Sequence, residues 1–419
     1  MFELIPVETA QEIVLASTRE MPVEKVALLD ALGRVVACDL VSDVDINGFA
    51  DASMDGFAIK SADVAEASGE HPATLRIVDV VGAGYLYKGV LQSGEAVRIM
   101  TGAAMPEGAD ANVKIEDVEV TGDGLTGETV IFKKPVKAGA NVRQAGEEAK
   151  AGQTVFLRGD KINPAGVGLL ATTGNTSVPV YARPRVGVIS IGTELVDSST
   201  VPGMGMKRDS NRYTLAAMAR DAGAEVTMYP IVPDEPEAIT AVYSRAAAEN
   251  NVVVSSGGAC GGDFDYVAQV ISTLGEVRFE FVNMRPGKAQ TFGVTPDGTL
   301  MFGLSGNPAA CATGFEVLVR PALRKAQGYR ELVRPYAWAK LGEYSGKKKE
   351  MRRFFVRGVL EQGANGEYTA VPLKKQSSAL IGTTSKCNCY IVLPEGGAPV
   401  APGMDVKCIR IDLEEGTVI

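Results

Sequence analysis

The chain has 419 residues, a formal net charge of −9, and 46% hydrophobic and 22% charged residues. This length exceeds the size at which one hydrophobic core stops growing, so we expect two to four domains. The acidic balance argues against a nucleic-acid or membrane partner, although an acidic protein can still hold an anion in a local basic pocket. The chain has no long apolar run and its N-terminus does not resemble a signal peptide, so we expect a cytoplasmic protein.

The N-terminal part of the chain predicts helices around a region of strands. Apolar residues at helical spacing predict one helix over Val7 to Thr18, after a proline, and another over Lys25 to Leu32. Residues 46–140 contain short strands broken by glycine, which predicts a small β-rich domain. Residues 141–178 lead through a polar turn and a short strand to a helix after Pro164, and we expect them to return and pack on the N-terminal helices.

The middle of the chain alternates short apolar strands with helices, which predicts a parallel sheet. Each apolar run ends in a loop with polar or charged residues. Ligands bind at the carboxyl ends of the strands in such a sheet, so we expect the loops to meet at one site. The predicted strands are residues 186–190, 252–255, 277–282 and 299–304, and the predicted helices are residues 212–222, 236–249, 265–274 and 308–326.

After Arg334 the chain returns to short strands separated by glycine turns, beginning near the single tryptophan, Trp338, which predicts a small β-barrel. The predicted fold class is therefore multidomain α/β plus β. It combines a central parallel α/β sheet domain with a small β-rich domain, a helical and extended linking domain, and the C-terminal barrel. The predicted domains are the linking domain at 1–45 and 141–178, the β-rich domain at 46–140, the α/β domain at 179–327 and the barrel at 328–419.

Three loops of the α/β region have the composition of anion-binding sites. The sequence GGACGGDFDY contains two Gly-Gly pairs, which expose backbone N–H groups near the start of a helix. RPGK adds Arg285 and Lys288 on a tight turn, and GNP at Gly306 to Pro308 offers another helix N-terminus. The glycine-rich loop lacks the lysine of a P-loop and the G-x-G-x-x-G spacing, so neither a P-loop enzyme nor a Rossmann dehydrogenase is indicated.

Several polar residues beside these loops also fit purely structural roles. Asp55 precedes a glycine, as a turn residue would, and Thr101 fits the end of a strand. Glu194 stands where a carboxylate stabilises a helix start, and Asp209 to Asn211 are all residue types that cap helices. Taken singly, each of these residues could either stabilise a turn or helix end or take part in a functional site.

The scarcity of histidine restricts the chemistry. His71 is the only histidine and stands beside no serine or cysteine nucleophile, so Ser-His-Asp, Cys-His and zinc mechanisms have little support. Acid/base work and metal binding would then fall to aspartate and glutamate, which suit Mg²⁺ with phosphate ligands. The six cysteines are scattered, which indicates reduced thiols, and the close pair Cys387 and Cys389 lacks the second pair of a zinc site.

Ten segments occur in order along the chain with a familiar spacing. They are SMDGFA, RIMTGAAMPEGAD, NVRQAGEE, PRVGVISIGTEL, DSNRY, IVPDEPEAI, SSGGACGGDFDY, RPGK, SGNPAA and IVLPEG. In these segments the sequence resembles the MoeA family of molybdopterin molybdenumtransferases, whose relatives include the E domain of gephyrin. The resemblance extends over essentially the whole chain.

The resemblance implies a transferase that inserts molybdate into adenylylated molybdopterin, releases AMP and leaves molybdenum cofactor. It also implies Mg²⁺ as cofactor and an elongated four-domain subunit. The subunit would form a homodimer with the active site at the subunit interface, supplied by an upstream molybdopterin adenylyltransferase.

The family motifs carry roles to matching residues of this chain. Catalytic roles fall on Asp55, Thr101, Glu148, Glu194, Asp234 and Asp265. Of these, the expected Mg²⁺ ligands are Glu194, Asp234 and Asp265. The expected substrate-binding residues are Ser210, Asn211, Gly257, Gly258, Cys260, Gly262, Arg285, Gly287, Lys288, Gly306, Asn307, Arg352 and Arg353. The last two are basic residues of the C-terminal domain that could contact molybdate.

The chain departs from the family pattern at several positions. Cys260 replaces the usual serine of the glycine-rich loop, which exchanges a strong hydroxyl donor for a weak one, and Ser305 replaces the proline before GNP. Asn112 interrupts a stretch that commonly reads AVV. The alternatives are a non-catalytic molybdopterin carrier, a gephyrin-like scaffold, or a paralogue that inserts tungstate, an oxyanion nearly equal to molybdate in size.

Overall fold

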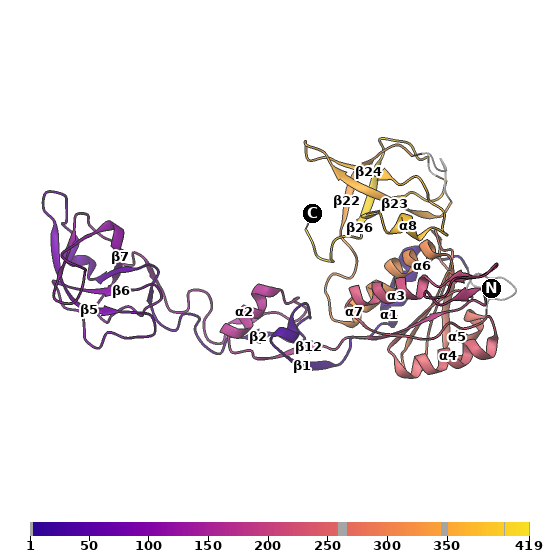
Figure 1. Cartoon of the computed structure of the whole chain (residues 1–419), viewed down its shortest axis with the longest axis horizontal. Helices are drawn as coiled ribbons and strands as arrows, with labels where there is room; N and C mark the ends of the chain where they lie inside the picture. Colours follow the sequence, from indigo (N-terminus) through magenta and orange to yellow (C-terminus); the bar gives the residue numbers. More distant parts are fainter. Residues whose placement is uncertain (1–2, 259–265, 345–350, 398, 419) are drawn as a thin grey trace.

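The computed structural model describes residues 3–258, 266–344, 351–397 and 399–418. The chain is elongated, with a sheet of short strands at one end, a small linking region in the middle, and an α/β sheet with a C-terminal β-barrel at the other end (Figure 1). Within the described residues, no helix is both long and apolar enough to cross a membrane.

The N-terminal β-rich region forms one six-stranded sheet around a core that includes Phe57, Ile77 and Phe132. Glycine turns and alternating apolar residues explain the short strands, and the predicted β-rich fold is confirmed. In this sheet β4 lies between β7 and β6, and Gly56 pairs with Ile99. The strands, in sheet order, are β7 (Ala111–Lys114), β4 (Gly56–Ile59), β6 (Glu95–Ile99), β5 (Ala73–Val81), β9 (Thr129–Phe132) and β8 (Glu119–Val120).

The linking region corrects one predicted element. The predicted helix over Lys25 to Leu32 is wrong: the segment forms β1 (Val23–Ala27) and the 3₁₀ turn η1 (Leu29–Ala31). β1 pairs with the distant strand β12 (Ser177–Tyr181), and these interstrand hydrogen bonds outweigh a short helical pattern.

Residues 141–178 do return to the N-terminal segment, but their partners there are strands instead of the predicted helices. β11 (Thr154–Phe156) pairs with β2 (Leu40–Val41), and β12 pairs with β1. The helix predicted after Pro164 is confirmed as α2 (Pro164–Thr172), whose first turn is capped by the Asn163 side chain.

The predicted first helix is confirmed as α1 (Val7–Ser17), and it packs in the core of the α/β region. Val7, Ala10 and Val14 share one helix face, and all three are buried in the same cluster as the sheet residues Val186 and Val188. The N-terminus of the chain is thereby fixed to the α/β sheet, far from the β-rich region (Figure 1).

The α/β sheet is mixed, not fully parallel as predicted. Four strands run parallel, and the other two form an antiparallel extension. The strand over Ala289–Val294 was not predicted; it begins directly after the RPGK turn, and so short a connection permits an antiparallel pair but no crossover helix. The strands, in sheet order, are β16 (Glu225–Met228), β13 (Arg185–Ser190), β17 (Val252–Ser256), β21 (Leu300–Leu304), β20 (Ala289–Val294) and β18 (Glu276–Phe281).

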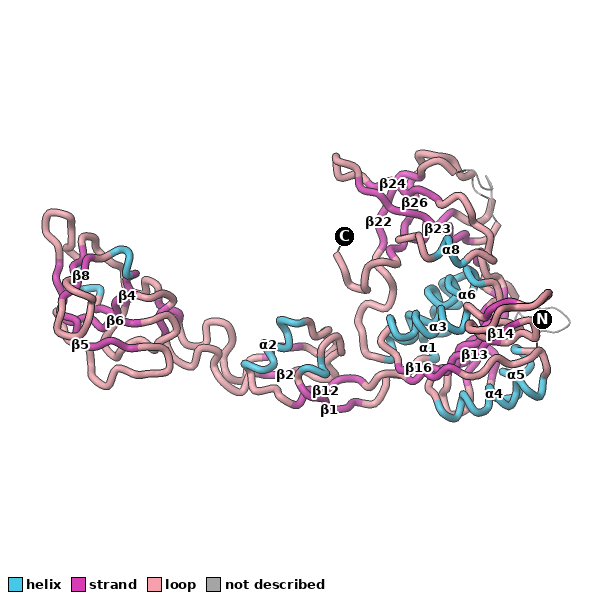
Figure 2. Tube along the Cα trace, viewed as in Figure 1, coloured by secondary structure: helices cyan, strands magenta, loops and turns pink. Residues whose placement is uncertain are grey.

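Alternation along the strands supplies two cores, one on each face of this sheet. Val186 and Val188 face α3, α6 and α7, whereas Ile189 and Val253 face α4 and α5, as the two layers of helices in Figure 2 show. The predicted helices exist: two have the predicted ends and two differ by one or two residues, and the last contains a π-helical turn. The helices are α3 (Asn211–Asp221), α4 (Pro236–Glu249), α5 (Val267–Leu274), α6 (Pro308–Gly314) and α7 (Arg320–Ala326), with η4 (Phe315–Val319) between the last two.

The predicted C-terminal barrel is confirmed, because its strands form a ring in which β23 pairs with both β24 and β25. A short strand from the α/β region, β19 (Met284–Arg285), joins this sheet by pairing with β23. This pairing places the RPGK turn beside the start of β23. The barrel strands are β22 (Tyr336–Leu341), β23 (Arg353–Gln362), β24 (Tyr368–Pro372), β25 (Cys389–Leu393) and β26 (Asp405–Arg410).

A buried ionic cluster ties the C-terminal segment to α7. The Glu415 carboxylate lies 2.5 Å from Arg320 Nε and 2.5 Å from Arg324 Nη2. Burial alone would raise the pKa of Glu415, but hydrogen bonds and charge from the two arginines lower it to about 2. Arg334 extends the cluster through Glu316, at 2.8 Å. The cluster holds the last residues of the chain against the α/β region.

Candidate functional site

A cavity of about 470 Å³, the strand-end cavity, lies at the carboxyl ends of β13 and β17. The loops that follow these strands line it together with the start of α3 and the GNP turn, as expected for an open α/β sheet. It therefore brings together many of the residues predicted from the sequence. The predicted residues in its lining are Glu194, Ser210, Asn211, Asp234, Gly257, Gly258, Gly306 and Asn307.

Three carboxylates line this cavity, those of Glu194, Asp209 and Asp234, and backbone N–H groups fix the segments that carry Glu194 and Asp234. The Thr193 N–H donates to Asp234 Oδ2 at 2.8 Å, and the Asp234 N–H donates to the Thr193 hydroxyl at 3.1 Å. This reciprocal contact clamps the GTEL turn, and with it Glu194, to the segment that carries Asp234. Glu194 is exposed and Asp234 half-buried, so both can meet a ligand that enters from solvent.

Glycine is required where the loops approach each other. Gly257 has a φ of +97°, and a Cβ there would lie 2.1 Å from the carbonyl oxygen of Ile191. No side chain fits that space, so the start of the glycine-rich loop can lie directly on the GTEL turn.

A second cavity of about 500 Å³, the basic cavity, adjoins the first, and Asn307 lines both. Its described lining contains the basic residues Arg285, Lys288 and Arg352 and no acidic residue. Phe354 stacks beneath the Arg285 guanidinium at 4.5 Å from the ring centroid. These residues come from the RPGK turn and the start of β23, which the β19–β23 pairing brings together. The cavity suits an anion with several oxygen atoms.

A loop of the barrel region also lines the basic cavity, and sequence reasoning missed it. Gln376, Ser377 and Ser378 contribute an amide and two hydroxyls. The carbonyl of Ser378 accepts from the Ala309 N–H at 2.9 Å, and Arg357 Nη2 donates to the Ser377 carbonyl at 3.1 Å, so the loop is held from both sides. The only sequence signal is a polar KKQSS run, which is common in solvent-exposed turns.

The two arginines predicted to contact molybdate take different positions. Arg352 lines the basic cavity. Arg353 instead pairs with Glu8 and, at 2.8 Å, with Glu395, and it lines a separate cavity between α1 and the barrel. Neighbouring residues at a strand point to opposite sides, so the structure brings only one of the two to this site.

Asp55 and Thr101 form a cluster of their own in the β-rich region. Asp55 precedes β4 and Thr101 follows β6, so both lie at the same edge of that sheet. The Thr101 N–H and hydroxyl both donate to Asp55 Oδ1 at 2.7 Å, and these hydrogen bonds lower the pKa of Asp55. Within one chain this cluster lies at the opposite end from the strand-end cavity (Figure 1).

Gly287, also predicted to bind substrate, lines the basic cavity. The remaining predicted residues lie apart from both cavities or outside the described residues. Glu148 is exposed in a turn of residues 141–153, near the linking region. Cys260, Gly262 and Asp265 lie outside the described residues. Across the described residues there is no group of three or more acidic, histidine or cysteine side chains placed to hold a metal. Glu194 and Asp234 alone still fit Mg²⁺, which commonly binds through one or two carboxylates plus substrate phosphates.

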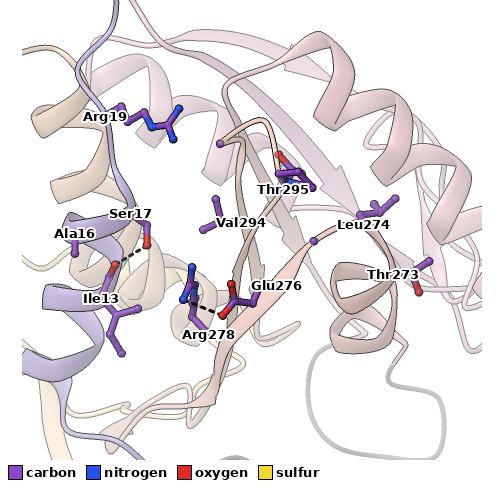
Figure 3. A pocket seen from close by; sticks show the side chains of 13 residues that line it. Ile13, Ala16, Ser17, Arg19, Thr273, Leu274, Glu276, Arg278, Val294 and Thr295 are labelled. Carbon is purple, nitrogen blue, oxygen red and sulfur yellow. Dashed lines mark hydrogen bonds and ion pairs between the residues drawn. The ribbon is translucent and has the colours of Figure 1, made fainter.

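Cavity size alone does not identify the site. A larger cavity of about 850 Å³ lies between the end of α1 and the β18–β20 pair. Figure 3 shows Arg278 paired with Glu276 in this cavity, at 2.9 Å, with Arg19 on the far side. No residue predicted from the motifs lines it. The strand-end cavity is distinguished instead by the predicted loops that meet in it, which approach so closely that glycine is required at Gly257.

Comparison with known proteins covers almost the whole chain. Residues 5–174 match the MoeA N-terminal region (domain I and II), residues 187–325 a probable molybdopterin binding domain, and residues 339–411 the MoeA C-terminal region (domain IV). The molybdopterin molybdenumtransferase of Staphylococcus aureus strain Mu50 is 36% identical over 406 residues, which cover 97% of this chain and 95% of the relative. That of Bacillus subtilis strain 168 is 35% identical over 415 residues, 99% of this chain and 95% of the relative.

Solved structures agree with the sequence comparison. A crystal structure of the molybdopterin biosynthesis MoeA protein from Pyrococcus horikoshii is 31% identical and has a TM-score of 0.81. The match covers 97% of this chain and 99% of that chain. The similarity therefore includes the arrangement of the whole subunit as well as its separate parts.

Proposed function

The chain belongs to the MoeA family of molybdopterin molybdenumtransferases, which act in molybdenum cofactor biosynthesis, and we propose that it inserts molybdate into adenylylated molybdopterin with release of AMP. One observation carries the proposal: a cavity lined by three carboxylates, with Lys207 and Arg208 beside them, meets a cavity lined by three basic residues at Asn307. The substrates are a pyrophosphate-linked nucleotide and a tetrahedral oxyanion. A site for both needs cationic donors next to a place for a divalent metal.

The strand-end cavity fits the phosphate end of the substrate. Glu194 and Asp234 would hold Mg²⁺, with Asp265 as a further proposed ligand. Bound there, Mg²⁺ would offset the negative charge of the phosphates. Gly257 and Gly306 allow the backbone to approach the phosphates closely, and the Asn211 amide is held in the wall by hydrogen bonds to Ser256 Oγ and the Gly306 carbonyl, at 2.7 and 2.8 Å.

The basic cavity fits molybdate. Arg285, Lys288 and Arg352 supply positive charge, and Ser377 adds a hydroxyl donor beside them. In the proposed reaction water cleaves the phosphoanhydride bond to give AMP and the phosphate of molybdopterin. The two dithiolene thiols bind molybdenum, and one molybdate oxygen leaves with their two protons as water. These residues would hold the oxyanion next to the pterin while the neighbouring cavity retains the AMP half.

We propose that the complete site forms across a homodimer. Asp55 and Thr101 lie at the far end of the same chain, so they can join the cavities only from a second copy. The exposed Asp55 carboxylate, kept ionised by the lowered pKa, would then act as a polar group near the reacting phosphate. Glu148 would also come from the second subunit. An upstream molybdopterin adenylyltransferase would supply the substrate.

Mixed dimers test the shared site. Asp55→Asn and Asp234→Asn homodimers are each expected to be inactive. Co-expressed with two different affinity tags and purified through both, the heterodimer should regain activity, because one of its two sites then holds both native residues. Heterodimers as inactive as the parents would contradict a site built from two subunits. Co-purified wild-type chains with the same tags provide the control.

The reaction itself is tested by AMP release from adenylylated molybdopterin. With Mg²⁺ and molybdate the purified protein should release AMP, and Asp234→Asn should lose this activity because a proposed metal ligand is neutralised. Parallel reactions with tungstate show which oxyanion is used. Asp405→Asn, which alters an exposed carboxylate of the barrel, serves as the control. Saturable binding without any release would overturn the proposed transferase and favour a carrier.

A further inference from the structure

A buried ion pair to which the family motifs assign no role begins in the wall of the strand-end cavity, where Asp209 is a lining residue. Asp209 is 3% exposed and Arg212 is 7% exposed. Asp209 Oδ1 accepts from the Ser190 hydroxyl at 2.9 Å and from the Arg212 N–H at 3.1 Å. Arg212 Nε lies 3.1 Å from Asp209 Oδ2, an ion pair without hydrogen-bond alignment. Of the three cap-type residues at the start of α3, Asp209 is the one whose side chain accepts a hydrogen bond from a backbone N–H of the first turn.

The rest of the Arg212 guanidinium reaches two other segments of the site. Nη1 donates to the carbonyl of Tyr229 at 2.8 Å, and Nη2 donates to Asp197 Oδ2 at 3.2 Å. Asp197 lies three residues after Glu194, just beyond the GTEL turn, and Tyr229 begins the segment that leads to Asp234. A single side chain therefore connects the start of α3 with the two segments that carry Glu194 and Asp234.

Tyr229 gives this connection a fixed anchor. Its ring is buried, and its hydroxyl lies 2.5 Å from Glu249 Oε2 and 2.9 Å from Asn250 Nδ2, at the end of α4. A planar guanidinium can hold three acceptors in fixed directions, whereas a lysine ammonium at the end of a flexible chain cannot. Burying this pair costs desolvation energy, and the hydrogen bonds to Ser190, Tyr229 and Asp197 offset part of that cost.

We propose that Arg212, held by Asp209, is a positioning residue that sets the distance between the Glu194 turn and the Asp234 segment. It does not touch the substrate; it determines whether the two carboxylates face the phosphates together. This inference rests on the proposed function of the cavity. It also makes a claim about loop order that can be measured without any substrate.

The main test is Arg212→Lys, which keeps the positive charge but loses the planar guanidinium that holds three acceptors in fixed directions. Hydrogen–deuterium exchange should become faster in peptides covering residues 191–197 and 229–234, while exchange in α4 stays as in the wild type. In the AMP-release assay the KM for adenylylated molybdopterin, whose phosphates would bind with the metal, should rise about 10- to 100-fold, the range typical for loss of a group that orients metal ligands. Unchanged exchange in both peptides would overturn the inference.

Two further variants separate positioning from folding. Asp209→Asn keeps the shape and the acceptor for Ser190 but removes the charge that holds Arg212, so it should show the same two changes more weakly. The matched control is Arg245→Met, which loses an exposed arginine that contacts the same Tyr229, at 5.7 Å from its ring, but does not line the cavity. This control should leave exchange and KM unchanged. Equal effects in Arg245→Met and Arg212→Lys would contradict a specific role for Arg212.

The two readouts also distinguish this inference from the proposed function. If the wild-type protein released no AMP, the proposed function would fail, and the exchange measurement would still decide whether Arg212 orders the two segments. If the wild type were active and Arg212→Lys showed faster exchange with an unchanged KM, the residue would order the loops without positioning the carboxylates, and the inference would be rejected.

Discussion

Lys288→Met is expected to lower the rate constant of AMP release about 100-fold, the effect of removing one preorganised donor to a developing or bound oxyanion. Lys288 lines the basic cavity with Arg285 and Arg352, and its ammonium lies 5.1 Å from the Phe281 ring. Methionine retains an apolar chain that can pack on this ring, so the substitution mainly removes charge. The measurement is the steady-state dependence of AMP release on molybdate and on adenylylated molybdopterin.

The two substrates show which ligand Lys288 binds. A higher KM for molybdate alone would place the oxyanion in the basic cavity, whereas a higher KM for adenylylated molybdopterin alone would place the phosphates there. Lys407→Met is the matched control, because Lys407 also contacts an aromatic ring, that of Tyr336 at 3.9 Å, but lines neither cavity. Wild-type kinetics in Lys288→Met would contradict the assignment of the basic cavity.

Glu415→Gln is expected to lower the free energy of unfolding by about 3–5 kcal/mol, the cost of breaking a buried ion pair on one side. The Glu415 side chain is 1% exposed, and Arg320 and Arg324 beside it are 2% and 5% exposed. The substitution leaves these two guanidinium groups buried without their shared counter-charge. Urea unfolding at neutral pH measures the difference. Asp405→Asn breaks an exposed pair in the same region, with Lys340, and should cost less than about 1 kcal/mol.

The same cluster predicts a pH dependence. The folded-state pKa of Glu415 is about 2, below its ordinary value of 4.5. The unfolded state therefore binds this proton first, and the contribution to stability is fully present above pH 4.5 and is lost as pH falls toward 2. Between pH 6 and pH 3 the wild type should lose more stability than Glu415→Gln. Parallel pH curves for the two proteins would show that this carboxylate is not the one that titrates.

Local sequence patterns correctly predicted those helices and strands whose apolar spacing and end residues lie within the element itself. The helix predicted over residues 236–249 is α4 with the same ends, because a proline opens it and Ile239, Tyr243 and Ala246 recur on one face. The buried strands of the parallel part of the sheet were found for the same reason, since their apolar runs are continuous. The order of the ten motifs was sufficient to identify the family.

Elements that depend on a distant partner were missed or misassigned. β1 carries a short pattern that fits a helix, and only its pairing with β12, more than a hundred residues away, makes it a strand. β20 follows the RPGK turn at once, and its antiparallel pairing with β18 and β21 is not visible in its own residues. Periodicity reports which face of a segment is apolar, not which segment covers it.

The same distinction between local signals and distant contacts applies to the residues of the site. The sequence by itself determined which residue types could bind phosphate, oxyanion and metal, because glycine turns, carboxylates and basic side chains are chemical properties of single residues. Only the tertiary structure decided that Arg352 faces the basic cavity while Arg353 pairs with Glu8, and that Asp209 in the wall of the strand-end cavity holds Arg212. These choices depend on strand pairing and burial, which are set by contacts between segments far apart in the chain.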